Sequence, residues 1–503
     1  MRKLDYRTYL DKMRACWLGK NIGGTLGAPF ECCQGAIDLD FYTHDIAKGV
    51  LPNDDLDLQL VWLLAAEREG KKLNAEILAN YWLTYIVPDW SEYGFSKRNL
   101  RAGILPSVSG GYANDFRESN GAWIRSELWA CLAPGRPDIA VRYAREDAAV
   151  DHWGEGIYAE MFCAAVQSAA FVESDMEKLI EIGLSYLPKE CVLEKAIRFV
   201  QACVKDSSLD WKAARKRLLQ RFTSSFGKRP LPGGEMDPEI PEPILGFDAP
   251  ANVALAVLAH YYSEGDFSRA VCIAAGCCED ADCTAGTIAA LYGIRGGTAC
   301  IDQKWLDPIG DEIKTVSLDK TKHGEPETVT ELTNRVARLM PSFMDESVRF
   351  DENGCIELTV CEGDELFAGG YTSWPDVRKW KSHADRLCLH GESAMLAVDA
   401  LFDTASVAND TLLPIELAID VKYACHQHAD WLTLVWHMPP EWEAVGGRES
   451  TVVLREYEKC DQVFKTGIIP HELRAGRYPI TLEIRQEGNP SRIYIPFTFM
   501  NTL

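Results

Sequence analysis

Residues 279–290 read Glu-Asp-Ala-Asp-Cys-Thr-Ala-Gly-Thr-Ile-Ala-Ala, a group of carboxylates followed directly by small side chains. Carboxylates are favourable beside a helix N-terminus, so the pattern predicts a helix that continues through residues 285–290. Residues 159–170 form a second segment rich in alanine. Because small side chains let helix backbones approach one another closely, both segments favour a compact all-helical body.

Hydrophobic periodicity divides the chain into a helical part and a β part. Leu56, Leu60, Leu63 and Leu64 recur at helical spacing, and helical segments continue to about residue 310. Beyond about residue 345 the period changes to two, in alternating runs at 356–360, 415–423, 432–436, 452–457, 480–484 and 493–499. We therefore predict a multidomain chain, with an all-α domain over residues 1–340 and an immunoglobulin-like β-sandwich domain over residues 345–503. A connecting helix is predicted over residues 314–340.

The composition is that of an acidic, folded protein. The 503 residues include 52 Lys and Arg against 75 Asp and Glu, a formal net charge of −23. An acidic surface repels phosphate backbones and anionic lipid headgroups, so nucleic acid and membrane surfaces are not expected partners. The contents of 47% hydrophobic and 25% charged residues are ordinary for a soluble globular protein.

The distribution of apolar residues and cysteines bears on the cell compartment. No apolar run approaches the roughly 18 residues of a membrane-spanning helix, and residues 1–7 are charged and lack an apolar signal core. The 17 cysteines show no Cys-x-x-Cys spacing, so we expect most of them to be reduced and buried. These features lead us to expect a cytoplasmic protein.

Two short segments each place several carboxylates at the start of a predicted helix. Residues 53–57 read Asn-Asp-Asp-Leu-Asp, and residues 279–282 read Glu-Asp-Ala-Asp. Neighbouring like charges repel one another, and a helix N-terminus offsets only part of that repulsion. Because Mg²⁺ and Mn²⁺ prefer carboxylate and amide oxygens, the segments predict a metal site if the fold brings them together. The alternative is that each segment only caps a helix.

Five short motifs follow one another between residues 19 and 283. They are Gly19-Lys-Asn-Ile-Gly-Gly-Thr-Leu-Gly-Ala-Pro-Phe-Glu31, Asn53-Asp-Asp-Leu56, Asn120-Gly-Ala-Trp-Ile-Arg125, Asp147-Ala148 with His152 and Gly156, and Gly276 to Cys283 with its Asp280 and Asp282. In this order they resemble the motifs of the ADP-ribosylglycohydrolases, the all-helical Mg²⁺-dependent hydrolases that include the dinitrogenase reductase-activating glycohydrolase. The β-rich part lies outside the resemblance, which therefore indicates a divergent branch with an added C-terminal β domain.

The resemblance implies which residues hold the metal. They are Asn53, Asp54, Asp55, Asp280, Asp282 and Cys283. The chain departs from the family pattern at Gly24, where the family has Asp, and at Asn53, Leu56 and Cys283, where it has Thr. A thiol is a poor ligand for Mg²⁺, so either Thr284 replaces the family hydroxyl or one metal binds weakly. We expect one or two ions of Mg²⁺ or Mn²⁺.

The resemblance also implies the catalytic and substrate-binding residues. Glu31 and Asp55 are the expected catalytic groups, which take a proton from water or stabilise developing positive charge. Asn120, Gly121, Arg125, His152 and Gly156 are expected at the substrate. The residue types alone leave alternatives open: Glu31 as a surface side chain, His152 as a structural histidine, and Arg125 as an arginine paired with a core carboxylate.

These residues together predict a metal-dependent glycohydrolase that cleaves a ribosyl-type N- or O-glycosidic bond. An ADP-ribosylated protein or another ADP-ribose derivative is the expected substrate. The alternatives are a furanoside or nucleoside hydrolase of the same fold and a non-catalytic protein that binds ADP-ribose or a sugar. Retention of all four aligned Asp residues argues against the non-catalytic alternative, because an unused buried carboxylate cluster destabilises a fold.

Overall fold

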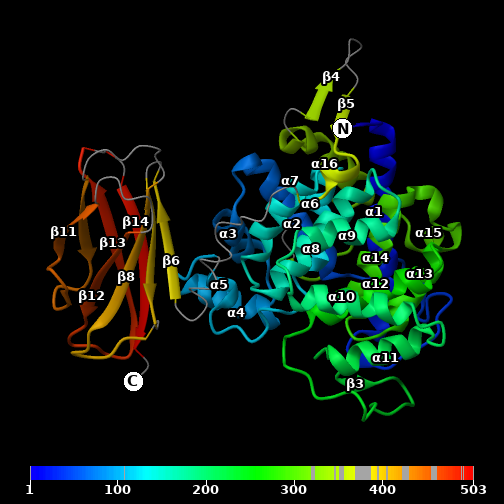
Figure 1. The fold of residues 1–503 in the computed structure, drawn as a ribbon, viewed down its shortest axis with the longest axis horizontal. Coiled ribbons are helices and arrows are strands. Elements are labelled where there is room, and N and C mark those ends of the chain that lie inside the picture. Colours follow the sequence, from blue (N-terminus) through cyan, green and yellow to red (C-terminus); the bar gives the residue numbers. More distant parts are fainter. Residues whose placement is uncertain are drawn as a thin grey trace. The chain divides into compact units, whose positions relative to one another are not determined.

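The computed structural model describes residues 2–106, 108–318, 323–344, 347–350, 356–368, 387–393, 396–403, 406–421, 430–454, 462–488, 490 and 492–501. The chain forms two compact units (Figure 1). The first comprises Met1–Ser96 and Ala113–Thr372, and the second comprises Lys97–Tyr112 and Ser373–Leu503. The first unit is mainly helical and the second is built from β-strands, which confirms the predicted fold class.

The helices of the chain are, in order, α1 (Tyr6–Gly27), α2 (Asp54–Glu69), α3 (Ala75–Tyr85), α4 (Ser91–Arg101), α5 (Val108–Gly111), α6 (Glu127–Leu132), α7 (Pro137–Ala148), α8 (Glu155–Ala170), α9 (Met176–Ser185), α10 (Val192–Val204), α11 (Trp211–Arg221), α12 (Ala249–Tyr262), α13 (Phe267–Gly276), α14 (Ala281–Gly296), α15 (Gln303–Ile309) and α16 (Val329–Met344). The predicted helix at residues 285–290 is part of α14. Every residue of α14 up to Ile294 is buried, and the helix packs against α1, α8, α12 and α13. It is therefore a central element of the helical unit.

Glycines and alanines set the distance between α1 and α14. A Cβ atom added to Gly23 would lie 2.2 Å from the carbonyl oxygen of Ala285, and one added to Gly27 would lie 2.3 Å from that of Ala281. Towards the other end of the pair, a Cβ atom on Gly293 would lie 2.3 Å from the carbonyl oxygen of Ala15. As the residue number rises along α1, from Gly23 to Gly27, the number of its contact in α14 falls, from Ala285 to Ala281. The two helices are therefore antiparallel. The two backbones touch at these glycines, where a side chain on the glycine would not fit.

The segment after α15 differs from the predicted connecting helix. Residues 314–318 are not helical, and α16 begins only at Val329. Gly324 and Pro326 precede α16, and the residue before a proline is disfavoured in the α conformation, so the helix starts after them. Residues 319–322 of the predicted helix lie outside the described residues.

A small sheet in the helical unit joins the N-terminus to a later part of the chain. It contains β1 (Arg2–Leu4), β5 (Ile356–Val360) and β4 (Val348–Phe350), with β5 antiparallel to both neighbours. A further short parallel pair joins β2 (Cys33–Gln34) to β3 (Arg229–Pro230). The alternation at residues 356–360 thus predicts a real strand, but its partner is the N-terminal strand of the first unit. Alternation reports which face of a strand is buried, not which strand it pairs with.

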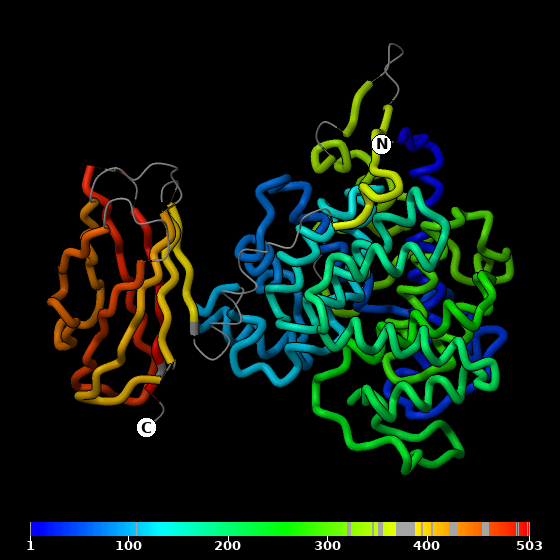
Figure 2. Tube along the Cα trace, viewed as in Figure 1, coloured from blue at the N-terminus to red at the C-terminus, as the bar shows by residue number. Residues whose placement is uncertain are grey.

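The second unit contains two antiparallel sheets. One has the order β10 (Glu443–Ala444), β12 (Gln462–Ile469), β8 (Leu413–Val421), β7 (Leu396–Phe402) and β6 (Leu387–Glu392). The other has the order β11 (Glu449–Leu454), β9 (Asp430–His437), β13 (Gly476–Gln486) and β14 (Arg492–Asn501). The predicted alternating runs lie in β8, β9, β11, β13 and β14, except residues 422–423 and 455–457, which fall outside the described residues. The chain trace in Figure 2 follows these strands through the unit.

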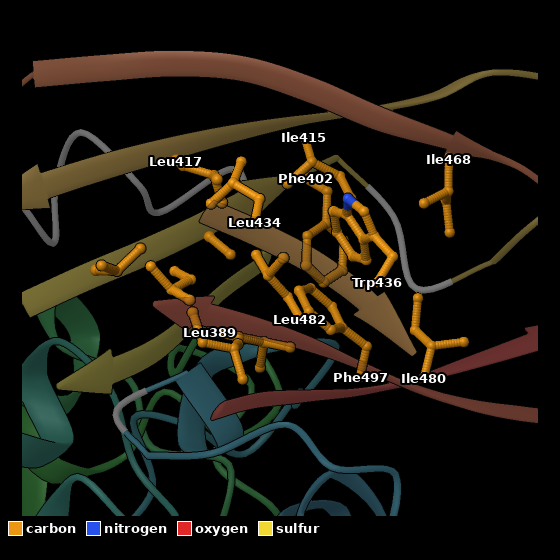
Figure 3. Close-up of a cluster of buried hydrophobic side chains, with 14 of the residues drawn as sticks. Leu389, Phe402, Ile415, Leu417, Leu434, Trp436, Ile468, Ile480, Leu482 and Phe497 are labelled. Carbon is orange, nitrogen blue, oxygen red and sulfur yellow. The ribbon is translucent and has the colours of Figure 1, made fainter. Parts of the chain in front are cut away.

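The core of the second unit lies between its sheets. Ile415 and Leu417 of β8, Leu434 and Trp436 of β9 and Leu482 of β13 are all buried. Figure 3 shows these side chains directed towards one another. The alternate residues of β8 and β9 are more exposed, which is the pattern of strands that bury one face.

Candidate metal centre

The antiparallel packing of α1 against α14 brings three carboxylates together. Glu31 follows α1 and the short 3-10 turn Ala28–Phe30, while Asp280 and Asp282 lie at the first turn of α14. One oxygen from each of these residues lies within 4.8 Å of the others. The structure thus places the carboxylate of Glu31 beside those of Asp280 and Asp282, which are about 250 positions later in the sequence.

A strained turn orients the acids before α14. Cys278 and Glu279 both have positive φ, 59° and 61°, a conformation that is uncommon for residues with a side chain. The backbone of Glu279 is held on both sides, because its carbonyl accepts from the Cys32 N–H and its N–H donates to the Cys33 carbonyl. Its side chain pairs with Arg215, 3.0 Å away. Glu279 is therefore a structural residue of the turn, and Asp280 follows as the N-cap without making a side-chain capping bond.

The first turn of α2 contributes Asp55 to a second, overlapping cluster. Ligand atoms of Asp55, Asp282 and Cys283 lie within 4.8 Å of one another, and all three residues are buried. Asp282 belongs to both clusters. One of its oxygens, Oδ1, is buried and has no hydrogen-bond partner in the described part of the chain. Such an atom in an acidic cluster favours a cation ligand, because an unpaired buried polar atom is otherwise destabilising.

Asn53 and Gly24, which both depart from the family pattern, lie next to each other in the structure. Asn53 is the N-cap of α2, and its side-chain oxygen accepts the Asp55 N–H at 2.8 Å. A Cβ atom on Gly24 would lie 2.2 Å from Nδ2 of Asn53, so Asn53 occupies the space that a larger residue at position 24 would need. The side-chain oxygen of Asn53 is engaged in capping, which is the alternative that the sequence left open for this residue.

The structure distinguishes between Cys283 and Thr284. The Cys283 thiol points into the centre and lies 3.2 Å from Oδ1 of Asp55. The Thr284 hydroxyl is fully buried and donates to the carbonyls of Ala281 and Ala274, at 3.2 and 3.4 Å. The family hydroxyl therefore has no replacement from Thr284 here.

The remaining acids of residues 53–57 have different surroundings. Asp54 is half-buried and accepts a hydrogen bond from the Tyr93 hydroxyl at 2.8 Å. Asp57 is fully buried and accepts the backbone N–H groups of Val316 and Ser317, both at 2.6 Å. Asp57 therefore holds the 316–317 loop and belongs to neither cluster.

Lys20 is a buried cation at the centre that the sequence analysis did not single out. Its ammonium lies 3.1 Å from Oδ2 of Asp55 and 3.2 Å from Oε1 of Glu127. Burial lowers the pKa of Lys20, but the carboxylates of Asp55 and Glu127 more than offset this and raise the pKa above its ordinary value. A signal was present in the sequence: a lysine stands inside the glycine-rich segment 19–31, where a buried helix face would otherwise be apolar.

Burial and like charge raise the pKa of the acids in the centre. Burial and the adjacent Asp55 raise the pKa of Asp54 to about 7 and also raise the pKa of Glu31. Burial and the Glu31 charge raise the pKa values of Asp280 and Asp282 well above the usual range. A divalent cation favours the ionised carboxylates, so cation binding at this cluster would release protons.

Of the residues expected at the substrate, Asn120 contacts Asp280. Asn120 donates to Oδ2 of Asp280 at 2.7 Å and accepts from the Trp123 indole at 3.1 Å. A Cβ atom on Gly121 would lie 2.1 Å from Oε1 of Glu92. Gly121 is therefore a position where the chain approaches a buried carboxylate too closely for a side chain.

His152 and Gly156 pack behind this loop. His152 is fully buried, with Nδ1 at 3.0 Å from Oδ1 of Asp151 and Nε2 at 4.0 Å from Oε1 of Glu92. A Cβ atom on Gly156 would lie 2.7 Å from Cδ2 of His152, so the glycine makes room for the imidazole. In this structure both residues support the loop that carries Asn120 and Gly121.

Arg125 lies in an internal ion cluster. It is fully buried and donates to Asp147 at 2.8 Å, to Asp151 at 2.6 Å and to the Gly121 carbonyl at 2.7 Å. Its guanidinium lies 5.1 Å from the ring centre of Trp82. This environment favours an arginine paired with core carboxylates over an arginine that binds substrate. Through its hydrogen bond to the Gly121 carbonyl, Arg125 also holds Gly121 in position.

Replacement of Arg125 by lysine is expected to destabilise the helical unit by about 1–3 kcal/mol. Lysine keeps the charge, but it lacks the planar guanidinium that donates to two carboxylates and a carbonyl at once. Chemical denaturation measures the loss. Arg198→Lys is the matched control, since Arg198 pairs with Glu181 on the exposed surface, where we expect a change within about 0.5 kcal/mol. Equal losses for both variants would contradict the positioning role.

A family model described as ADP-ribosylglycohydrolase matches residues 5–342. The chain belongs to the ADP-ribosylglycohydrolase family. Membership confirms the resemblance of the five motifs, and the β-rich part lies beyond the matched residues. Members are glycohydrolases for ADP-ribose derivatives and are typically metal-dependent, which agrees with the acidic clusters at α14.

Two further comparisons concern solved structures and curated proteins. A solved structure described as "ADP-ribosylglycohydrolase-related protein complex" is 18% identical, with a TM-score of 0.44, and the alignment covers 67% of this chain and 100% of that chain. No curated protein matches the chain. None of the helices in the described ranges is long and apolar enough to cross a membrane. The cysteines of the described ranges are free, and most of them are buried.

Proposed function

We propose that this member of the ADP-ribosylglycohydrolase family is a metal-dependent enzyme that cleaves a ribosyl-type glycosidic bond, with an ADP-ribosylated protein or another ADP-ribose derivative as substrate. The observation that carries the proposal is the convergence of Glu31, Asp55, Asp280 and Asp282 from α1, α2 and α14 in overlapping clusters. Acids from three distant parts of the chain would not be gathered in a buried site unless a cation offset their repulsion.

The donor set fits a hard divalent ion. Glu31, Asp280 and Asp282 offer only carboxylate oxygens, which Mg²⁺ and Mn²⁺ prefer. When bound, such an ion lowers the pKa of a coordinated water and orients hydroxyl groups of the sugar.

Glu31 is the proposed acid–base residue, acting through the carboxylate oxygen that it does not offer to the ion. It is half-buried, whereas Asp55 is fully buried with one oxygen beside Lys20 and the other beside Cys283. A group that exchanges a proton with water must reach solvent or substrate, so the structure supports Glu31 over Asp55 for this step. Asp55 then acts as an anionic support at the centre.

Asn120 is the proposed positioning residue on the substrate side. Its amide holds Oδ2 of Asp280, and its loop is held from behind by His152 and Arg125. This arrangement fixes the direction of the Asp280 carboxylate before a ligand binds, which is the preorganisation that a metal and sugar site needs.

Release of ADP-ribose from an ADP-ribosylated protein, followed by chromatography in the presence of Mg²⁺, tests the proposed function. We expect turnover that EDTA abolishes and that added Mg²⁺ restores. Release of a base from nucleosides without release of ADP-ribose would indicate a nucleoside hydrolase instead. Binding of ADP-ribose without turnover would indicate a non-catalytic binding protein.

Addition of Mg²⁺ or Mn²⁺ is expected to raise the melting temperature of the protein, because an ion that binds only the folded state stabilises it by mass action. At an ion concentration of roughly 100 times the dissociation constant, the gain is about 2.7 kcal/mol. Thermal scans with EDTA and with millimolar Mg²⁺ measure the shift, and Ca²⁺ provides a comparison with a larger ion. An unchanged midpoint in every ion would contradict a metal centre.

A further inference from the structure

We propose that the Lys20 ammonium takes the place of a second cation in the centre, so that the chain binds a single divalent ion at Glu31, Asp280 and Asp282. This inference rests on the proposed function and adds to it the number and position of the metal ions. The sequence resemblance implies one or two ions, and the position of Lys20 favours one.

The position of Lys20 is that of a bound cation. Its side chain is 1% exposed, and its ammonium has three oxygen neighbours, Oδ2 of Asp55, Oε1 of Glu127 and Oγ1 of Thr287, at 3.1, 3.2 and 3.1 Å. The ammonium donates hydrogen bonds to Glu127 and Thr287, whereas its contact with Asp55 is an ion pair in which Oδ2 accepts no hydrogen bond from the described residues. The lysine is therefore a fixed part of the centre and not a mobile surface group.

The fold provides space for the lysine between α1 and α14. A Cβ atom on Gly286 would lie 3.3 Å from Cδ of Lys20 and 3.4 Å from Oδ2 of Asp55. A larger side chain at position 286 would therefore press on both the lysine stem and the carboxylate that it pairs with. Gly286 therefore leaves room for the ion pair between Lys20 and Asp55.

Neutral groups as well as charge hold Glu127 in place beside Lys20. Oε1 of Glu127 accepts from Gln167 at 3.1 Å, and Oε2 accepts from Gln59 at 2.9 Å. Glu127 is fully buried, so its charge needs a cation, and Lys20 provides it. The lysine is thus anchored from both sides and cannot move away without leaving buried carboxylates unpaired.

The Asp55 cluster is consequently a poor site for a hard ion. Oδ2 of Asp55 faces the Lys20 ammonium, and Oδ1 faces the Cys283 thiol at 3.2 Å. A thiol is a soft donor that Mg²⁺ does not favour, and an adjacent positive charge repels a second cation. Lys20 and the departure from the family pattern at Cys283 therefore both disfavour a hard ion beside Asp55.

The Glu31 cluster keeps the properties of a metal site. Among the described residues, no lysine or arginine nitrogen lies within 4.0 Å of the carboxylates of Glu31, Asp280 or Asp282. Oδ1 of Asp282 is buried and has no hydrogen-bond partner among the described residues, and Asp282 as a whole is only 7% exposed. The single ion is therefore expected on this side of Asp282, away from Lys20.

Mn²⁺ binding to the full chain tests the proposal without reference to activity. Titration calorimetry and metal analysis are expected to give one Mn²⁺ per chain, and electron paramagnetic resonance is expected to show the hyperfine pattern of an isolated ion. Two ions per chain with a spin-coupled spectrum would overturn this inference and leave the proposed function standing. No bound Mn²⁺ would overturn both.

Variants of Lys20 test whether the ammonium excludes the second ion. Lys20→Met combined with Cys283→Thr is expected to raise the stoichiometry from one to two, whereas Lys20→Arg, which keeps the charge, should retain one. If the methionine variant does not fold, Glu127→Gln is added, because it removes the second carboxylate that Lys20 neutralises. A folded variant without the lysine charge that still binds only one ion would overturn the role of Lys20.

Discussion

Replacement of Asp282 by asparagine is expected to remove both metal binding and hydrolysis, with a loss of activity larger than the roughly 10–100-fold change that follows removal of a group behind a metal ligand. Asp282 is the residue that the two clusters share, and its unpartnered Oδ1 is the atom best placed to bind a cation. Asparagine has nearly the same shape but no charge, so the fold should persist while the ion is lost. Metal analysis and the rate of ADP-ribose release measure the two effects.

Asp57→Asn is the matched control for this variant. Asp57 is as deeply buried as Asp55 in the same helical turn, but its carboxylate accepts the N–H groups of Val316 and Ser317. We expect this variant to keep its metal and to alter only stability. Retention of metal and activity in Asp282→Asn would show that the centre does not lie at α14.

Replacement of Gly23 by alanine is expected to destabilise the helical unit by about 3 kcal/mol or more, at the upper end of the range for overpacked cores. The added Cβ atom would lie 2.2 Å from the carbonyl oxygen of Ala285 and 2.3 Å from its carbonyl carbon. Both contacts are with backbone, so no side-chain rotation can relieve them and α1 must move away from α14. Since Glu31 follows α1, metal affinity should fall together with stability.

Scanning calorimetry measures the loss in the Gly23 variant as a fall of roughly 4 °C or more in the melting temperature, because the entropy of unfolding is about 2.1 cal/mol/K per residue and the helical unit is large. Gly234→Ala is the control, because Gly234 lies in an exposed loop and a Cβ atom there would come no closer than 3.3 Å to its neighbours. A Gly23 variant as stable as the Gly234 variant would show that the two helices tolerate a wider separation.

The local pattern of the sequence was sufficient for the elements and for part of the site. The small residues after position 280 predict α14, and the alternating runs at 432–436 and 480–484 predict β9 and β13. These patterns are local, because the repeat of a helix or strand determines which residues share a face. The motif order predicts that Asp55, Asp280 and Asp282 are parts of one site, and this stays a prediction until metal binding is measured. The domain boundary at residues 340–345 also stays a prediction.

The tertiary structure decided how the side chains of that site are used. Lys20 is 35 positions before Asp55, Thr284 turns its hydroxyl to backbone carbonyls while Cys283 faces the centre, and β5 pairs with the N-terminal strand. The Lys20–Asp55 contact and the pairing of β5 with β1 do not follow from a repeat of two or 3.6 residues, because each joins parts of the chain whose relative position is set by long-range packing. The sequence by itself determined which elements form and which acids belong to the family pattern. The packing of α1 against α2 and α6 decided that a lysine shares the centre with those acids, since it brings the Lys20 ammonium to the buried carboxylates of Asp55 and Glu127.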